Sequence, residues 1–400
     1  MRILFLVTQS KESPSGGGRY WPLAKALVGL GHSVTIIALH HNYVSVKKRQ
    51  YMEDGVQVKY VGQMHVRKID NQKLYYGSLR MLFIALMATI SLTWTAFRTP
   101  ADVIHICKTQ PMNGVAGWLV HLFRRIPVYL DSDDFESVNN RFGARWQQRV
   151  VAWFENWLPS FADGITVGTS FTGNHFIALG YPPERIFLVL NGVERKRFDI
   201  LNHEELPIRL SELRSQLSVE GRPIVVYVGS ISLTSHALDI LLKAFVHVMD
   251  ASPNSVLLLF GSGEDREKLN KMAHNLGLKD QVRFLGRIPV DDIPLYFRVG
   301  QVTVDPMHAS LAAESSLSLK LVESIVAGVP CVTGDIGDRR MVVGGAGFAV
   351  KPGNPEALAD GILKILNDPE LQQKMHENSQ DMRDELFWDN RVHSFIEVYR

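Results

Sequence analysis

The sequence predicts an α/β protein made of two doubly wound domains, each with a parallel sheet. Short runs rich in Val, Ile, Leu and Phe alternate with longer helical patterns along the chain, and this alternation is typical of βαβ units. A polar, charged stretch at residues 191–223 separates two such series. The two series also differ in charge, which indicates two domains with different partners.

The expected strands follow from the apolar runs. In the first series they are residues 2–7, 33–39, 56–61, 102–106, 126–131, 164–169 and 185–190. In the second series they are residues 223–229, 255–261, 282–286, 302–306, 329–334 and 347–350. Helical patterns between them, such as residues 16–29 and 144–160, imply right-handed crossovers. We place the domain boundary at Gly192 because the polar linker begins there.

The composition excludes several classes of protein. With 400 residues, 46% hydrophobic and 21% charged, the chain is neither disordered, collagen-like nor stapled by disulfides. Cys107 and Cys331 lie in separate apolar runs, so we expect buried, reduced thiols and a cytoplasmic protein. The apolar run at residues 2–7 is too short for a signal peptide.

Charge is divided unevenly along the chain. Residues 1–200 hold 23 Lys and Arg against 14 Asp and Glu, a net charge of +9, and residues 201–400 hold 20 against 27, a net charge of −7, which together give the overall +2. The first half contains the basic clusters, which are Lys47, Lys48 and Arg49, then Arg67 and Lys68 with Lys73, and Arg124 with Arg125. A solvated face, anionic lipid and a phosphorylated substrate are alternative explanations. No nucleic-acid recognition motif accompanies the charge.

One apolar stretch bears on membrane binding. Residues 81–97 carry no charge, include four Ser or Thr, and are flanked by Arg80 and Arg98. The stretch is shorter than the roughly 20 residues that a bilayer core requires. It therefore predicts either a buried helix or an interfacial helix with one apolar face on lipid.

Glycines follow the first predicted strand of each series. Gly16, Gly17 and Gly18 precede a helix, where glycine permits close approach of a ligand and free N–H groups attract anions. A simple tight turn is the alternative. In the second series Gly229 ends the first strand and Gly261 follows the second, at the strand ends where open α/β sheets bind ligands.

Two groups of charged residues are candidate ligand contacts. Lys320 and Glu323 are three residues apart, so they share one helix face. The carboxylate suits ribose hydroxyls and the ammonium suits a diphosphate, whereas an ion pair between the two is the structural alternative. After the strand at residues 126–131 come acidic residues that suit acceptor hydroxyls, a helix N-terminus or a divalent metal. They are Asp131, Asp133, Asp134 and Glu136.

The succession of motifs resembles glycosyltransferases with the GT-B fold, most closely the retaining enzymes of family 4. The resemblance spans nearly the whole chain, through the glycine-rich loop, DVIH at residues 102–105, NGVERKRF, GSGEDREKL, VRFLGRIP, LKLVESIVAGVPCV and PGNPEALADGI. It implies two Rossmann-like domains facing a central cleft. Residues 1–192 would bind the acceptor, residues 193–385 would bind a nucleoside-diphosphate sugar, and residues 386–400 would cross back to the first domain.

The resemblance also implies roles for individual residues. Glu323 would hold the donor ribose, and the backbone around Arg287 would flank the base. Relatives usually carry an Arg and a Lys that grip the diphosphate where this chain has Ser230 and His236, and a glutamate where it has Ser315, with Glu314 displaced by one. The chain instead fits a serine-rich form of the motif through Ser316, Ser318, Lys320 and Glu323.

A third departure lies in the first domain. Relatives often show His-x-His after the strand ending in DVIH, and this chain has His105, Cys107 and Lys108. We therefore take His105 and Lys108 as candidate catalytic residues, with Lys108 supplying charge that Ser230 lacks. An ordinary hydrogen-bonded histidine is the alternative for His105. Neither cysteine has a base partner nearby in the sequence, so no covalent nucleophile is expected.

The expected function is sugar transfer from a nucleotide sugar to an acceptor hydroxyl, with retention, in glycolipid or surface-polysaccharide assembly. The resemblance implies no metal and no cofactor beyond the nucleotide sugar. We expect a lipid-linked or saccharide acceptor, an anionic membrane surface as a further partner, and no nucleic acid. Peripheral attachment to the inner face of the membrane would use Lys47, Lys48, Arg49 and the helix at residues 81–97. The alternative is a non-catalytic GT-B subunit, which would explain the departures at Ser230, His236 and Ser315.

Overall fold

The computed structural model describes residues 1–69, 72–140, 142–233 and 236–400. The side chain of Lys73, part of one expected basic cluster, lies outside this description. The chain divides into two compact units: unit 1 is Met1–Gly192 with Trp388–Arg400, and unit 2 is Val193–Phe387. The first division falls at the expected boundary, and the return to unit 1 begins at residue 388 rather than 386.

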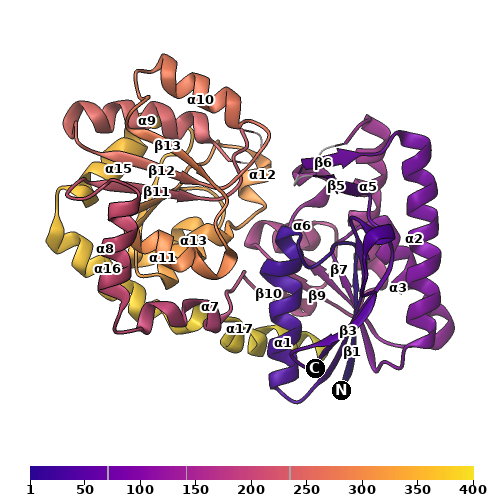
Figure 1. The fold of residues 1–400 in the computed structure, drawn as a ribbon. Helices are drawn as coiled ribbons and strands as arrows, with labels where there is room; N and C mark the ends of the chain where they lie inside the picture. The colour runs from indigo at the N-terminus through magenta and orange to yellow at the C-terminus, as the bar shows by residue number, and fades with distance from the viewer. Residues whose placement is uncertain (70–71, 141, 234–235) are drawn as a thin grey trace. The chain divides into compact units, whose positions relative to one another are not determined.

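Unit 1 contains an eight-stranded sheet in the order β10-β9-β8-β7-β1-β2-β4-β3 (Figure 1). Its strands are β1 (Arg2–Val7), β2 (Ser33–His40), β3 (Gln50–Glu53), β4 (Val56–Gln63), β7 (Val103–Cys107), β8 (Val128–Ser132), β9 (Gly164–Val167) and β10 (Ile186–Leu188). Neighbouring strands are parallel except for the antiparallel pair β3 and β4. The strand order reverses between β1 and β7, and such a switch point is where open α/β sheets bind ligands.

Helices cover both faces of this sheet. On one face lie α1 (Trp21–Gly29) and α17 (Trp388–Ile396), which share a core cluster with Phe5. On the other face lie α2 (Ser78–Arg98), α3 (Pro111–Arg124) and α5 (Arg145–Trp157), which share a cluster with Leu4 and Leu6. Because both faces are covered, strands such as β7 are fully buried and read as continuous apolar runs.

The smaller elements of unit 1 complete the loops. They are a π-helical turn η1 (Gly16–Tyr20), the 3₁₀ turns η2 (Tyr43–Ser45), η3 (Leu158–Phe161) and η4 (Pro183–Arg185), α4 (Glu136–Asn139), α6 (Ser170–Ala178) and, at the C-terminus, η9 (Glu397–Tyr399). β5 (Val66–Ile69) and β6 (Gln72–Tyr75) form an antiparallel hairpin. The sequence analysis did not predict this hairpin or β3, because short edge strands bury too little to show a clear apolar run.

Unit 2 contains a six-stranded parallel sheet in the order β13-β12-β11-β14-β15-β16. Its strands are β11 (Ile224–Val228), β12 (Val256–Phe260), β13 (Val282–Gly286), β14 (Val302–Asp305), β15 (Cys331–Gly334) and β16 (Gly347–Val350). The order reverses between β11 and β14, which places a second switch point there. Two doubly wound units confirm the fold class that the sequence predicts.

Helices also lie on both faces of the second sheet (Figure 1). One face carries α9 (Leu238–Ala251), α10 (Arg266–Asn275) and α15 (Pro355–Leu366), which meet in one core cluster. The other face carries α8 (Leu206–Gln216), α11 (Ile293–Val299), α13 (Leu319–Val326) and α16 (Pro369–Arg383). The remaining short helices and turns are α7 (Arg195–Phe198), η5 (Asp199–Asn202), η6 (Val290–Asp292), α12 (Leu311–Glu314), α14 (Arg339–Val343), η7 (Gly344–Ala346) and η8 (Asp384–Leu386).

Candidate functional site

The predicted donor-binding residues of unit 2 lie along the carboxyl edge of its sheet, where the loops after parallel strands meet. They are Gly229, Ser230 and His236 after β11, Arg287 after β13, and Ser316, Lys320 and Glu323 on and before α13. α13 connects β14 to β15, so it starts next to the switch point between β11 and β14. The fold therefore brings to one edge residues that are up to 94 positions apart, from Gly229 to Glu323.

Lys320 is the central cation of this edge, and it is already paired. Its Nζ donates to Asp305 Oδ1 at 3.2 Å, to Ser318 Oγ at 3.0 Å and to His236 Nδ1 at 3.2 Å. Burial opposes ionisation of Asp305, but the charges of Lys320 and Arg339 outweigh burial and lower the pKa of Asp305 to about 2. Lys320 is therefore the counter-ion of a buried carboxylate.

His236 does not replace the lysine that relatives carry. Burial and the neighbouring charge of Lys320 lower the pKa of His236 to about 3. The imidazole is neutral at physiological pH, and its Nδ1 accepts a hydrogen bond from Lys320. The prediction that His236 contributes charge to a diphosphate site is wrong for this reason, although the ring remains next to the cation that could.

Glycines allow the loops at this edge to approach each other closely. A Cβ on Gly261 would lie 1.8 Å from the carbonyl oxygen of Gly229, and the φ of Gly261 is +139°. A Cβ on Gly263 would lie 2.0 Å from the carbonyl oxygen of Ile231, and one on Gly229 would lie 2.9 Å from Cε of Lys320. Glycine is thus required here for loop packing and for the path of the Lys320 side chain.

Glu323 has a partner that the sequence analysis did not identify. Nη2 of Arg197 donates to Glu323 Oε1 at 2.7 Å, and the two side chains are 12% and 7% exposed. The same Nη2 also donates to the carbonyl oxygen of Val290. Arg197 lies on α7 within the quoted NGVERKRF motif, and its place in that motif was the signal available in the sequence. Lys320 and Glu323 bind different partners, so the surface ion pair between them is not formed.

The other predicted donor contacts occupy plainer positions. Arg287 is exposed, and its Nε donates to Ser262 Oγ at 2.5 Å. Ser316 donates to the carbonyl oxygen of Ala312 at 2.8 Å. Ser230 is exposed. The serine-rich segment is held from below by buried Arg339, which donates to the carbonyl oxygens of Ala313 and Ser316 and to Asp305.

In unit 1, Asp131 is part of a buried ion pair. Nη2 and Nε of Arg19 donate to its two carboxylate oxygens at 2.6 and 2.8 Å, and neither side chain is more than 1% exposed. Thr166 donates to the same carboxylate at 2.6 Å. The prediction that Asp131 binds acceptor hydroxyls is wrong because its oxygens already serve buried donors. Arg19 directly follows the three glycines, and it ties η1 to the end of β8.

Lys108 is surrounded by acidic side chains. Its Nζ lies 2.9 Å from Asp133, 3.3 Å from Asp134 and 2.6 Å from Glu136, and Lys108 is buried. Three carboxylates more than neutralise one ammonium, so the prediction that Lys108 compensates for a missing diphosphate contact is wrong. These carboxylate oxygens lie within 4.8 Å of one another, close enough to hold a metal ion. The Lys108 ammonium already provides a cation among them.

His105 is a core histidine. It is fully buried, its ring lies 4.8 Å from that of Phe395, and its Nδ1 is 2.9 Å from the hydroxyl of Tyr399. Burial lowers the pKa of His105 to about 4. The side chain packs between β7 and the C-terminal segment, so the alternative of an ordinary hydrogen-bonded histidine fits and a catalytic contact does not.

The glycine-rich loop of unit 1 is shaped by backbone packing. A Cβ on Gly16 would lie 2.1 Å from the carbonyl oxygen of Ser10, and one on Gly17 would lie 2.8 Å from that of Lys11. The π-helical turn that starts at Gly16 forms where the two segments touch. This is the close-packed turn that the sequence analysis named as the alternative to anion binding, and the donor-binding role of Gly16 and Gly17 stays a prediction.

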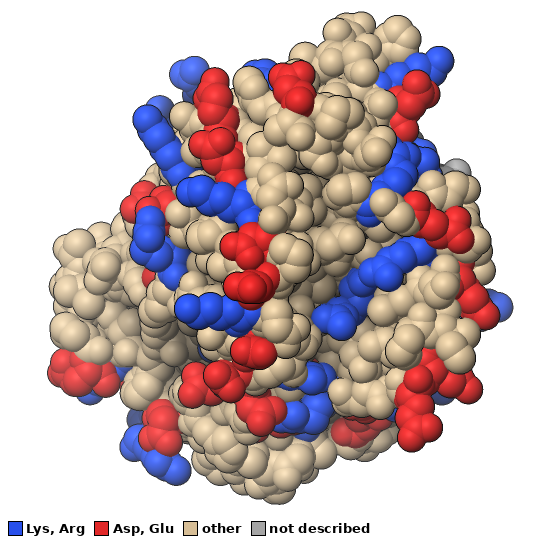
Figure 2. Space-filling model, turned by 90° about the vertical axis from the view of Figure 1, so that its left-hand side faces the viewer, with Lys and Arg blue, Asp and Glu red and all other residues tan. Residues whose placement is uncertain are grey.

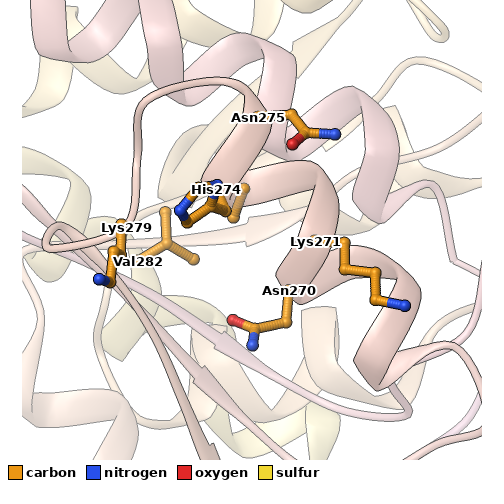
Figure 3. Close-up of a pocket in the computed structure, with 7 residues that line it drawn as sticks. Asn270, Lys271, His274, Asn275, Lys279 and Val282 are labelled. Carbon is orange, nitrogen blue, oxygen red and sulfur yellow. The ribbon is translucent and has the colours of Figure 1, made fainter.

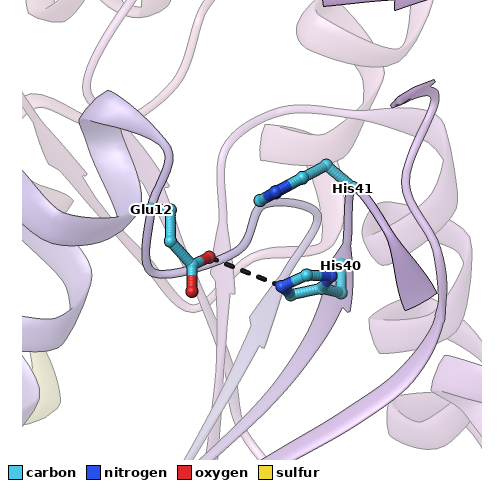
Figure 4. Close-up of side chains that lie close together, drawn as sticks. All are labelled: Glu12, His40 and His41. Carbon is cyan, nitrogen blue, oxygen red and sulfur yellow. Dashed lines mark ion pairs between the residues drawn. The ribbon is translucent and has the colours of Figure 1, made fainter. Parts of the chain in front are cut away.

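A further polar cluster lies beside this loop (Figure 4). Nε2 of His40 lies 3.6 Å from Glu12 Oε2, and His41 stacks on His40. Two histidines and a glutamate are a possible metal-ligand set. However, the backbone N–H of Asn42 donates to His40 Nδ1 at 3.0 Å. The neutral His40 ring therefore carries its proton on Nε2, which makes that nitrogen a donor to Glu12 rather than a metal ligand.

One pocket in unit 2 lies away from the predicted site (Figure 3). It is lined by Asn270, Lys271, Ala273, His274, Asn275, Lys279 and Val282. Val282 is the first residue of β13, so this pocket lies at the amino edge of the sheet. The residues considered above lie at the opposite edge, and the pocket is not part of their site.

Two family models match the chain. The model described as "Glycosyl transferase 4-like domain" matches residues 15–192, and the model described as "Glycosyl transferases group 1" matches residues 210–382. Together they cover most of both units. The predicted donor-binding edge lies within the second match, and the ion pairs of Arg19 and Lys108 lie within the first.

Individual proteins resemble the chain at lower identity. An uncharacterized glycosyltransferase of Methanocaldococcus jannaschii is 24% identical over 305 residues, 75% of each chain. A GDP-mannose-dependent phosphatidylinositol monomannoside mannosyltransferase of Mycobacterium tuberculosis is 26% identical over 210 residues, 52% of this chain and 53% of the relative. The crystal structure of Anabaena HepE in complex with UDP-glucose has a TM-score of 0.73 at 20% identity, covering 100% of this chain and 98% of the other.

Proposed function

Because the chain belongs to the GT-B glycosyltransferases of the family 4-like type, we propose that it moves a sugar from a nucleoside-diphosphate sugar to an acceptor hydroxyl with retention of configuration. The observation that carries the proposal is the arrangement at the carboxyl edge of unit 2. Glu323 and Lys320 stand on one helix beside a switch point, with Arg197 fixing the first and Asp305 the second. A carboxylate and an ammonium in this position match the ribose and the diphosphate of a nucleotide sugar.

Donor binding uses the second oxygen of Glu323. Arg197 occupies Oε1, and a carboxylate retains further acceptor sites, so Oε2 accepts from a ribose hydroxyl. Lys320 has three ammonium protons, which serve Asp305, Ser318 and His236. A diphosphate oxygen replaces one of these acceptors. His236 is the acceptor released, because it is neutral while Asp305 is charged.

Transfer requires charge stabilisation on the leaving diphosphate as the bond to the sugar breaks. Lys320 supplies that charge in unit 2. For the acceptor we propose Asp134, whose side chain is 32% exposed while Asp133 is 5% exposed and also accepts from the Tyr20 hydroxyl. Its carboxylate accepts a hydrogen bond from an acceptor hydroxyl. No metal or organic cofactor is part of the proposal, because cationic side chains occupy both carboxyl edges.

The acceptor class follows from similarity. The mycobacterial relative is named for a glycolipid substrate, a phosphatidylinositol monomannoside, and the structural neighbour was solved with UDP-glucose. We accordingly propose a hexosyl donor and a role in glycolipid or surface-polysaccharide assembly.

One observation favours the second candidate, a non-catalytic GT-B subunit. His236 is neutral and Lys320 is tied to Asp305, so the diphosphate site has less free charge than a site with an additional Arg and Lys. Such a protein would retain nucleotide binding without transfer.

Mass spectrometry of reactions with a panel of nucleotide sugars and acceptors distinguishes the candidates, with calorimetry of nucleotide binding run in parallel. Transferase activity gives a glycosylated product that is lost in Glu323→Ala. Nucleotide binding with no product from any pair supports the subunit, and the absence of both binding and product rejects both candidates.

A further inference from the structure

α2 is apolar on two sides, and only one of them is used by the fold. Ala88, Leu92 and Ala96 are buried and pack on the sheet of unit 1. A second stripe on the same helix is exposed and repeats at intervals of three or four residues. It consists of Leu79, Phe83, Leu86, Ile90, Trp94 and Phe97, flanked by exposed Leu82 and Met87. An exposed apolar stripe about 30 Å long, the length of a 21-residue helix, requires a partner.

The neighbouring helices extend this surface. α2, α3 and α5 contribute to one core cluster, so they lie on the same face of the sheet. At the end of α3, Leu122 and Phe123 are 54% and 69% exposed, and Phe123 lies 6.1 Å from Phe97 of α2. On α5, Trp146, Val150 and Trp153 form another exposed stripe. We call the outer surface of these three helices the apolar layer.

The charges of the apolar layer are of one sign. Among the residues of α2, α3 and α5 the only carboxylate is Glu155, and it is buried. The exposed charges are arginines, namely Arg80 and Arg98 on α2, Arg125 directly after α3, and Arg145 and Arg149 on α5. The face drawn in Figure 2 is different, because Lys and Arg there alternate with Asp and Glu.

We propose that the apolar layer docks on the headgroup region of an anionic lipid bilayer. Tryptophan and arginine beside aliphatic side chains are the composition of an interfacial surface. Arginines without neighbouring carboxylates are complementary to anionic headgroups. The proposal concerns where unit 1 binds, and it stands whether or not the transferase proposal is correct.

Two other occupants fit less well. α2 is long and apolar enough to cross a membrane, with 17% of its most apolar window buried. However, Ala88, Leu92 and Ala96 hold one side of it in the core of unit 1, so the helix lies along a bilayer rather than across it. A second copy of the chain is disfavoured because a symmetric contact would place arginines opposite arginines.

The test is flotation of the full chain with vesicles of phosphatidylcholine alone or mixed equally with phosphatidylglycerol, without donor or acceptor. The matched variants are the double substitution Leu86→Glu with Ile90→Glu on the exposed stripe, and Ile208→Glu on α8, where Ile208 is 62% exposed. We expect binding to the anionic vesicles, at least a tenfold loss of binding in the double variant, and no change in Ile208→Glu. Salt should weaken the binding without abolishing it, because apolar insertion is not screened.

A second readout does not depend on the folding of the double variant. Brominated lipid should quench the tryptophan fluorescence of the wild type, and Trp94→Phe should reduce that quenching. Failure to float with anionic vesicles at low salt overturns the proposal. Equal binding by the double variant and the wild type also overturns it. A dimer that the double variant dissociates, in a chain that ignores vesicles, would assign the apolar layer to self-association instead.

Discussion

Arg197 offers a sharp test of the donor site, because it touches Glu323 and nothing in the proposed chemistry requires it to touch the substrate. Replacing Arg197 with Met removes the guanidinium that lies 2.7 Å from Glu323 Oε1 and that is itself anchored to the carbonyl oxygen of Val290. The carboxylate then loses its fixed direction. If Oε2 is aimed at the ribose by this contact, nucleotide binding weakens even though Glu323 is intact.

The magnitude follows from the kind of contact that is lost. A hydrogen bond between charged groups contributes about 1.5–3 kcal/mol, which corresponds to roughly a ten- to hundredfold increase in the Kd of a nucleoside diphosphate. The effect should appear mainly in KM for the donor, since Arg197 positions a binding residue, with a smaller change in kcat. Arg197→Lys should recover part of the affinity because it restores the charge without the fork geometry.

The assay is titration calorimetry with nucleoside diphosphates, supported by thermal melting to establish that each variant is folded. Lys196→Met is the matched control, since Lys196 is an exposed residue of the same helix and the substitution removes the same charge. Unchanged affinity in Arg197→Met would refute the positioning argument. Tighter binding would reverse it, because Arg197 would then be competing with the ribose for Glu323.

Three further predictions follow from the same structure. Glu323→Ala should weaken nucleotide binding by about 1.5–3 kcal/mol, and calorimetry on the folded variant that shows wild-type affinity would remove Glu323 from the site. Lys108→Met should lower stability by about 3–5 kcal/mol in urea unfolding, because it leaves three clustered carboxylates without their cation, and a fully stable variant with reduced turnover would restore the catalytic role. Burial raises the pKa of Glu155 to about 7, so the folded chain keeps a proton that the unfolded chain releases. Stability should therefore fall by about 3 kcal/mol as pH rises from 4.5 to 7, and urea unfolding of Glu155→Gln should lack that part of the pH dependence.

Much of the fold could be predicted because it is encoded locally. Strands such as β1 and β11 are buried on both faces and therefore stand out as unbroken apolar runs. The loops that carry the candidate donor residues follow these strands, so their gathering at one sheet edge was also predictable. The short strands β3, β5 and β6 lack that signal, and they were missed.

The pairing of charges could not be predicted, because it depends on contacts between distant positions. Glu323 meets Arg197 across 126 positions, and Asp131 meets Arg19 across 112. The partners of Lys108 lie 25 to 28 positions away on another loop. The type of a residue indicates that a cation is present, but only the packed structure shows whether a carboxylate already neutralises it. Three predicted roles failed for this reason, those of Lys108, His236 and Asp131.

The paired state of Lys320 changes how the missing family residues should be understood. In a site with a separate Arg and Lys, the diphosphate meets cations that are free to receive it. Here the one buried cation of the edge has all three of its protons committed, one of them to a neutral imidazole. Exchanging His236 for a phosphate oxygen replaces a neutral acceptor by an anionic one, which is a stronger bond at the same donor. The chain therefore needs no additional cation to bind a diphosphate, provided that the loop after β11 lets His236 move, and the mobility of that loop controls donor affinity.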